Sequence, residues 1–134
     1  MSVKRIGVLT SGGDAPGMNP CVRAVVRTAL YHGIEVYGIR RGWNGLISGD
    51  VIKLDQRSVA HTINRGGTIL YTARSKEFMT KEGLEKAVST CKFLGLDSIV
   101  AIGGDGTFRG ARALSKYGIN VICIPATIDN DISC

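Results

Sequence analysis

Three short polar segments carry the residue types best suited to chemistry, and each directly follows an apolar run. Glycine allows backbone N–H groups to approach an anion closely, while carboxylates accept protons or hold Mg²⁺. Thr127–Asp131 places two carboxylates and an amide after an apolar run without a turn-forming glycine, which favours acid/base or metal chemistry. A plain polar loop is the alternative. The three segments are Thr10–Gly17, Gly103–Thr107 and Thr127–Asp131.

The standard phosphate-binding motifs are absent from the sequence. No lysine follows a glycine, as a P-loop requires, and Arg109 stands where a dinucleotide fingerprint needs its third glycine. A nucleoside triphosphate is also held by a carboxylate for Mg²⁺, by glycine backbone at close approach and by an arginine on the phosphate oxygens. Those parts are present as Asp105, the pair Gly104 and Gly106, and Arg74.

Most of these residues also have an ordinary structural explanation when each is taken alone. Asp105 suits a helix N-cap without any ligand, and Ser11–Gly13 suits a turn. Arg23 and Arg27 stand four residues apart on a predicted helix, which is the usual pattern of a solvated face. Trp43 is expected in the core or half-buried at the surface. Binding of a phosphorylated ligand is favoured over these explanations because the three polar segments are expected to lie close together.

Apolar periodicity predicts an alternation of strands and helices, and therefore an α/β fold. We expect a Rossmann-like, three-layer sandwich with a mainly parallel sheet. The carboxyl ends of parallel strands share one edge of a sheet, so the three polar segments are expected along that edge. The region 40–57 is the least regular. The expected strands are 6–9, 34–39, 51–54, 98–102 and 121–125, the last two buried, and the expected helices are 18–31, 58–63, 80–94 and 108–117.

Composition excludes several classes of protein. With 134 residues, 44% hydrophobic and 21% charged, the chain is expected to fold as one domain that needs neither disulfide nor metal for stability. No window reaches the roughly 18 consecutive apolar residues of a membrane-spanning helix, and no signal peptide is recognised. The net charge of +6 is spread along the chain, which disfavours nucleic acid and fits small phosphorylated ligands. Four widely spaced cysteines indicate free thiols in a reducing compartment, so we expect a cytoplasmic protein.

Four motifs occur in the order Gly7–Asn19, Gly66–Arg74, Gly103–Thr107 and Thr127–Asp131. Together they resemble the bacterial ATP-dependent 6-phosphofructokinases, and the resemblance spans the whole chain. It implies the fold of the phosphofructokinase N-terminal domain. It also implies the family's reaction, transfer of the γ-phosphoryl group of ATP to the 1-hydroxyl of fructose 6-phosphate, a committed step of glycolysis.

The resemblance implies a role for each motif residue. Asp129 would be the general base that accepts the proton of the sugar hydroxyl, and Asp105 would hold Mg²⁺. Arg74 would stabilise the transferring phosphoryl group, because its guanidinium is a permanent cation with a fixed fork of donors. The implied catalytic residues are Asp129, Thr127, Arg74 and Asp131; the implied ATP contacts are Gly13, Arg74, Ser75, Gly104, Asp105, Gly106 and Thr107; and the implied sugar-phosphate contacts are Thr127, Ile128 and Asp129.

The resemblance also has implications for the phosphoryl donor, for allosteric regulation and for the oligomeric state. Pyrophosphate-dependent relatives carry Asp where this chain has Gly106 and Lys where it has Ala126, so the small residues favour ATP. The family's allosteric nucleotide site uses basic residues of the first helix, which implies an effector role for Arg23 and Arg27. The implied assembly is a homotetramer, and the implied partners are ATP, ADP and fructose 6-phosphate, without nucleic acid or membrane.

Members of this family continue beyond the last motif into a second domain that supplies most of the sugar-phosphate site. We therefore expect residues 1–134 to be the ATP-binding N-terminal domain, with the second domain missing and with poor activity alone. Two other hypotheses stay open. One is a non-catalytic nucleotide-binding or regulatory module, and the other is a phosphate or nucleic-acid binder driven by the net charge.

Overall fold

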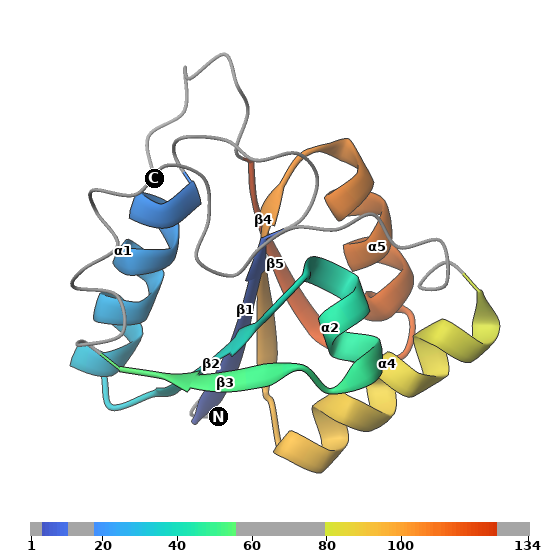
Figure 1. Cartoon of the computed structure of the whole chain (residues 1–134), viewed down its shortest axis with the longest axis horizontal. Helices are drawn as coiled ribbons and strands as arrows, with labels where there is room; N and C mark the ends of the chain where they lie inside the picture. The colour runs from blue at the N-terminus through green and yellow to red at the C-terminus, as the bar shows by residue number, and fades with distance from the viewer. Residues whose placement is uncertain (1–3, 11–17, 56–79, 126–134) are drawn as a thin grey trace.

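The computed structural model describes residues 4–10, 18–55 and 80–125. The strands in this part are β1 (Arg5–Thr10), β2 (Glu35–Ile39), β3 (Val51–Leu54), β4 (Ser98–Gly103) and β5 (Asn120–Pro125). They form one sheet in the order β3-β2-β1-β4-β5 (Figure 1). Four strands run parallel, while β3 pairs antiparallel with β2. The predicted mainly parallel sheet is confirmed.

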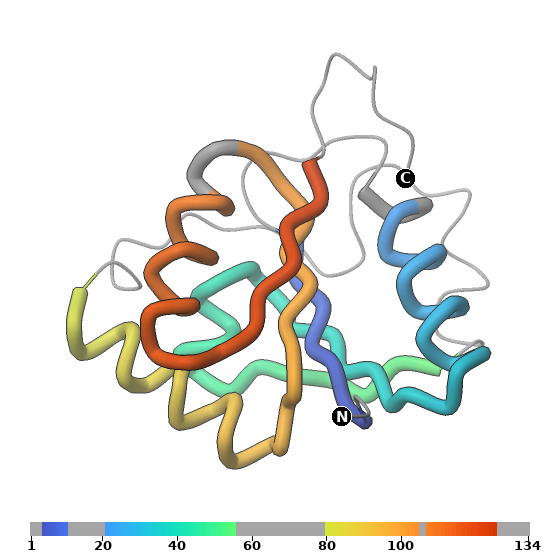
Figure 2. The backbone as a smooth tube through the Cα atoms, turned by 180° about the vertical axis from the view of Figure 1, so that it is seen from behind, coloured from blue at the N-terminus to red at the C-terminus, as the bar shows by residue number. Residues whose placement is uncertain are grey.

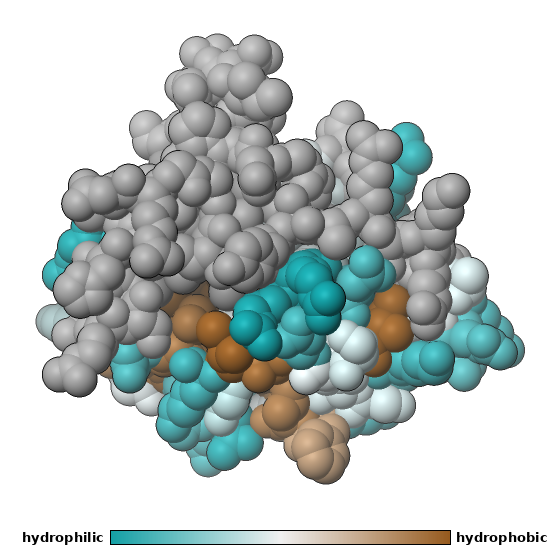
Figure 3. Space-filling model, in the orientation of Figure 1, coloured by the Kyte–Doolittle hydropathy of each residue, from teal (hydrophilic) through white to brown (hydrophobic). Residues whose placement is uncertain are grey.

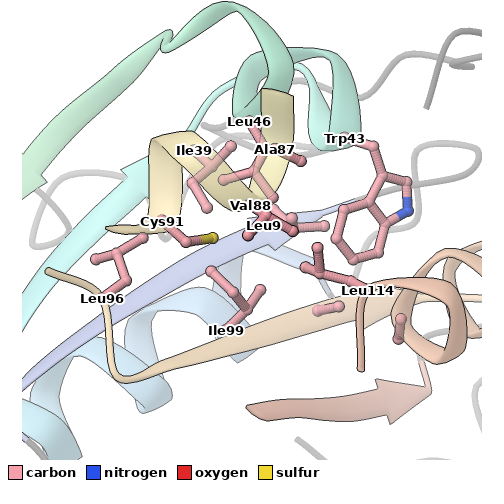
Figure 4. Close-up of a cluster of buried hydrophobic side chains, with 12 residues drawn as sticks. Leu9, Ile39, Trp43, Leu46, Ala87, Val88, Cys91, Leu96, Ile99 and Leu114 are labelled. Carbon is pink, nitrogen blue, oxygen red and sulfur yellow. The ribbon is translucent and has the colours of Figure 1, made fainter. Parts of the chain in front are cut away.

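Helices cover both faces of the sheet, which makes the architecture a three-layer sandwich (Figures 1 and 2). Helix α1 (Met18–Tyr31) covers one face, and α2 (Gly42–Ser48), α4 (Lys81–Leu94) and α5 (Asp105–Ser115) cover the other. Alternating side chains of the strands fill two separate cores. Val8 and Val100 join the core under α1, whereas Leu9 and Ile99 join the core under the other three helices, shown in Figure 4.

The two strands predicted to be buried differ in outcome. All six residues of β4 are buried, as predicted, because the strand lies between β1 and β5 under helices on both faces. The predicted burial of the strand at 121–125 is wrong: β5 is largely exposed, and Ile122 is 55% exposed. In the described part of the chain β5 has a single neighbouring strand, β4, so its outer side lacks cover. An apolar run therefore predicted a strand but not its position at the edge.

Helix boundaries follow the capping residues. The predicted helix at 80–94 is confirmed, since the Thr80 side chain accepts a hydrogen bond from the Gly83 N–H at 3.0 Å and Gly95 ends α4 at φ +69. The helix predicted to begin at residue 108 begins three residues earlier, at Asp105. Gly104, in extended conformation, takes the N-cap position and turns the chain directly from β4 into α5. The helix predicted at 58–63 lies outside the described residues.

Residues 42–48 form a helix that the sequence does not predict. The segment Gly42–Ser48 holds two glycines and an asparagine, which have low helix propensity. Tertiary packing compensates, because Trp43 is 4% exposed and Leu46 is fully buried in the core beneath α4 and α5 (Figure 4). The expectation that Trp43 belongs to the core is confirmed.

Gly45 is the point of closest backbone approach in this segment. A Cβ atom added there would overlap the backbone carbonyl oxygen of Arg40, so α2 or the turn before it must move to admit a side chain. We expect Gly45→Ala to lower the free energy of unfolding by about 3 kcal/mol, the upper range for overpacking, in urea denaturation followed by circular dichroism.

Gly49→Ala in the same segment is the matched control. Its added methyl group would meet no residue of the described ranges within 4 Å, and the left-handed backbone at φ +79 is the cost that remains. That strain costs about 1 kcal/mol. Equal losses of stability for the two variants would contradict the steric argument at Gly45.

Candidate functional site

The carboxyl ends of β1, β4 and β5 lie side by side at one edge of the sheet. The strand register pairs Thr10 with Ile102 and Gly103 with Pro125, so these strands end at nearly the same level. The described strands that precede the three predicted polar segments therefore end at one edge, while Thr127–Asp131 itself lies outside the described residues. β2 and β4 flank β1 on opposite sides, which puts a topological switch point between β1 and β4, the usual ligand position in α/β proteins.

Gly104 leaves open space at this switch point. Its φ of −108 lies outside the left-handed region that favours glycine, and a Cβ atom there would meet no described residue within 4 Å. Neither backbone strain nor packing requires glycine at this position, whereas a ligand in close approach would. Within the described ranges no side chain caps α5 at Gly104, and the unpaired N–H groups of a helix start are suited to an anion.

The Thr107 hydroxyl is a buried polar group in the first turn of α5. Thr107 is fully buried, and its Oγ1 has no hydrogen-bond partner within the described part of the chain. Leaving such a group unpaired costs roughly 1–3 kcal/mol, so native proteins usually pair it with protein, water, an ion or a ligand. Its position two residues after Asp105 makes it a polar group that a phosphate or a hydrated cation at this helix end would satisfy.

The structure describes only some of the other predicted site residues. The backbones of Asp105 and Gly106 lie in the first turn of α5. The predictions for the remaining residues rest on positions outside the described ranges. Those residues are Gly13, Arg74, Ser75, Thr127, Ile128, Asp129 and Asp131.

The two arginines predicted for an effector site lie on α1, on the opposite face of the sheet from α5 (Figure 1). Arg27 is exposed, as the solvated-face explanation requires. Arg23 is half-buried, and its buried Nε has no hydrogen-bond partner among the described residues. The solvated-face explanation therefore suits Arg27 better than Arg23.

Three of the four cysteines lie in the described part of the chain, and none of these three forms a disulfide there. Cys21 and Cys91 are buried and Cys123 is exposed. Burial raises the pKa of the Cys91 thiol to about 11, which keeps it protonated and unreactive near neutral pH. Within residues 4–10, 18–55 and 80–125, no three His, Cys, Asp or Glu side chains gather as metal ligands. In the same ranges no helix is both long and apolar enough to span a membrane.

One charged cluster, at the edge of the sheet where β1, β4 and β5 end, is not among the predicted site residues. Arg40 and Arg41, one of the two pairs of adjacent basic residues in the sequence, come directly after β2, and both pair with Asp50. Two adjacent arginines at the carboxyl end of a predicted parallel strand were the available signal. Their shared carboxylate partner, ten residues further on, required the tertiary structure.

Comparison with known proteins relates the whole chain to one family. The phosphofructokinase family model matches residues 5–134. The ATP-dependent 6-phosphofructokinase of Halalkalibacterium halodurans is 58% identical over 130 residues, 97% of this chain and 41% of that protein. That of Halothermothrix orenii is 59% identical over 133 residues, 98% of this chain and 40% of that protein.

A solved phosphofructokinase structure also resembles this chain. The crystal structure of Pichia pastoris phosphofructokinase in the T-state matches 99% of this chain and 16% of that one, with a TM-score of 0.89 and 36% identity. The chain spans about two fifths of the length of the curated relatives above.

Proposed function

The chain belongs to the phosphofructokinase family, and from this premise we propose that it carries the ATP-binding part of an ATP-dependent 6-phosphofructokinase. The proposed reaction transfers the γ-phosphoryl group of ATP to the 1-hydroxyl of fructose 6-phosphate. One observation carries the proposal: the described residues leave open space at Gly104 and no side-chain cap at the start of α5, at the switch point between β1 and β4.

The first turn of α5 would bind the phosphates of the nucleotide. Its free N–H groups and positive helix end attract an anion, and the buried Thr107 hydroxyl has a hydrogen bond to offer. Asp105 would hold Mg²⁺, for which a carboxylate beside a phosphate site is a suitable ligand. When bound, Mg²⁺ neutralises charge on the phosphate oxygens.

Phosphoryl transfer depends on positioning and charge stabilisation more than on covalent chemistry. Asp129 would accept the proton of the sugar 1-hydroxyl, and Arg74 would stabilise the charge of the transferring group. The remaining proposed contacts are Gly13, Ser75, Gly104 and Gly106 with ATP, and Thr127, Ile128 and Asp131 with the substrate and its phosphates.

Several wider properties belong to the same proposal. The small residues Gly106 and Ala126 favour ATP over pyrophosphate as the donor. Arg23 and Arg27 would form an allosteric effector site for a nucleotide. We propose a cytoplasmic homotetramer in which residues 1–134 form the ATP-binding N-terminal domain.

The experiment that tests the proposal is a titration of the 134-residue protein with MgATP, MgADP and fructose 6-phosphate. The single tryptophan, Trp43, is buried in α2 at the same edge of the sheet and supplies the fluorescence signal. We expect saturable binding of both nucleotides and low turnover in a coupled assay. Absence of nucleotide binding would refute the proposal. Binding without transferase activity in any longer form of the protein would favour the non-catalytic module.

Thr107→Val separates a ligand role from a structural role of the buried hydroxyl. The substitution keeps the shape and removes an unpaired polar group, so we expect the melting temperature to stay constant or rise. We expect the dissociation constant for MgATP to increase about tenfold, as for the loss of one hydrogen bond to a charged group. Thr107→Ser, which keeps the hydroxyl, is the control. A loss of stability with unchanged binding would contradict the ligand role.

A further inference from the structure

Arg40, Arg41 and Asp50 form an ion cluster where β2 passes into α2. The Arg40 guanidinium donates through Nε to Asp50 Oδ1 at 2.9 Å, and its Nη2 lies 2.7 Å from the same oxygen. Arg41 Nη2 donates to Asp50 Oδ2 at 2.9 Å. The carboxylate is thus shared, and the hydrogen bond from Arg40 is the main cause that holds the pKa of Asp50 below its usual range.

The backbone of Arg41 is strained. It is the one described non-glycine residue with positive φ, at φ 63 and ψ 39. Glycine or asparagine is the usual choice at such a position, because other side chains cost stability there. The conformation is held by its surroundings: Arg40 N–H donates to the Asp50 carbonyl at 2.9 Å, and the Gly49 and Asp50 N–H groups both donate to the Gly45 carbonyl. Strain maintained in this way is typical of functional positions.

The cluster lies at the ligand edge of the sheet. β2 runs parallel to β1 with Leu9 opposite Ile39, so Arg40 and Arg41 follow β2 at the level where β1 ends. Two strand spacings, roughly 10 Å in total, separate Arg41 from the end of β4. Figure 3 shows strongly hydrophilic side chains gathered over the junction of β2 and α2.

The charge of the cluster suits an anion. Two guanidinium groups share one carboxylate, which leaves one positive charge in excess. The Arg41 side chain is 60% exposed, whereas that of Asp50 is 18% exposed, so the positive group faces outward and the negative group inward. Within the described part of the chain, Asp50 is the one charged partner of Arg41, and most of its five N–H donors stay available.

We propose that Arg41, oriented by Asp50, is a nucleotide-affinity residue that contacts the polyphosphate of a nucleoside triphosphate bound between β1 and β4. The inference rests on the proposed function and deepens it. Arg41 binds the anion, while Asp50 is a positioning residue that fixes the guanidinium at the rim. The strained backbone is retained because it points this cation at the site rather than because it stabilises the fold.

The test compares Arg41→Gln, Arg41→Lys and Arg41→Gly in the 134-residue protein, with MgATP binding followed by Trp43 fluorescence. Arg41→Gln is expected to raise the dissociation constant about fivefold and to weaken its dependence on salt, since a charged contact is lost. Arg41→Lys keeps the charge and should recover much of the affinity. Arg41→Gly is expected to raise the melting temperature by relieving the strain while it weakens binding. Arg112→Gln, an exposed arginine in the last turn of α5, is the matched control and should match wild type.

Ligand fragments identify the part of the nucleotide that is recognised. Inorganic tripolyphosphate should lose affinity for the Arg41→Gln variant as ATP does, whereas adenosine should not. If the Arg41→Gln substitution weakened the binding of fructose 6-phosphate but not of ATP, Arg41 would be assigned to the sugar phosphate and the proposal would be overturned. A lower melting temperature for Arg41→Gly with unchanged MgATP affinity and salt dependence would also overturn it and leave a structural cluster. Absence of MgATP binding by the wild-type protein would instead refute the proposed function itself.

Discussion

For the proposed reaction, Asp129→Ala is expected to lower the kcat of a catalytically active form of the protein by about 10²–10⁴, the range expected when a general base is removed. Without the carboxylate, the proton of the sugar hydroxyl has no acceptor as the oxygen attacks the γ-phosphoryl group. The measurement is steady-state turnover of fructose 6-phosphate with saturating MgATP. Affinity for MgATP, measured by Trp43 fluorescence, should change little because Asp129 is assigned to the sugar side of the reaction.

Asp97→Ala supplies the carboxylate control for that experiment. Asp97 lies at the opposite edge of the sheet, where its Oδ2 accepts hydrogen bonds from the backbone N–H groups of Lys4 and Arg5 at 2.8 and 2.9 Å. We expect this variant to lose some stability and to keep its kcat. A fall of less than tenfold in kcat for Asp129→Ala would remove Asp129 from the role of general base.

Gly104→Asp is expected to raise the dissociation constant for MgATP by at least about 100-fold. The new carboxylate would occupy the open space at the start of α5 and would place a negative charge against the phosphates, where a repulsion of about 4 kcal/mol is typical at close range. Stability should not fall, because the position has room, has φ −108, and is an N-cap, where aspartate is preferred to glycine.

The opposite directions of the two effects make this variant informative. Binding is expected to be lost while the melting temperature is kept or raised, which is the pattern of a residue selected for a ligand rather than for the fold. Gly104→Ala is the graded control, with an intermediate loss of affinity near tenfold from its added methyl group. An unchanged dissociation constant for Gly104→Asp would show that no phosphate approaches this position.

The sequence predicted the elements whose signals are local. Helix α4 carries its apolar stripe between a threonine N-cap and a glycine stop, and β4 is a continuous apolar run, so both appear where they were expected. Helix α2 has no such signal, because its glycines and asparagine disfavour a helix and only the burial of Trp43 and Leu46 stabilises it. β5 reads as a buried strand because an apolar run contains no information about how many neighbours the strand has.

Some features of the candidate site were likewise predictable from the sequence, and others depended on the tertiary structure. The alternation of strands and helices predicts the three polar segments at one edge of a parallel sheet, and the described ends of β1, β4 and β5 agree with that prediction. The family, the expected phosphate chemistry and most of the proposed residues were therefore available from the sequence. The open space at Gly104 and the unpaired Thr107 hydroxyl were not, since both depend on what the rest of the fold leaves uncovered.

The residues themselves thus predicted the type of fold, the order of most of its elements and the class of ligand that we propose. Only the tertiary structure decided which strand lies at the edge, that residues 42–48 are helical, and that Asp50 joins Arg40 and Arg41 in a strained cluster beside the site. The physical reason is the distance along the sequence over which each kind of interaction acts. Capping, periodicity and glycine turns act over a few neighbouring residues, whereas burial, shared charges and backbone strain depend on contacts between segments distant in the sequence.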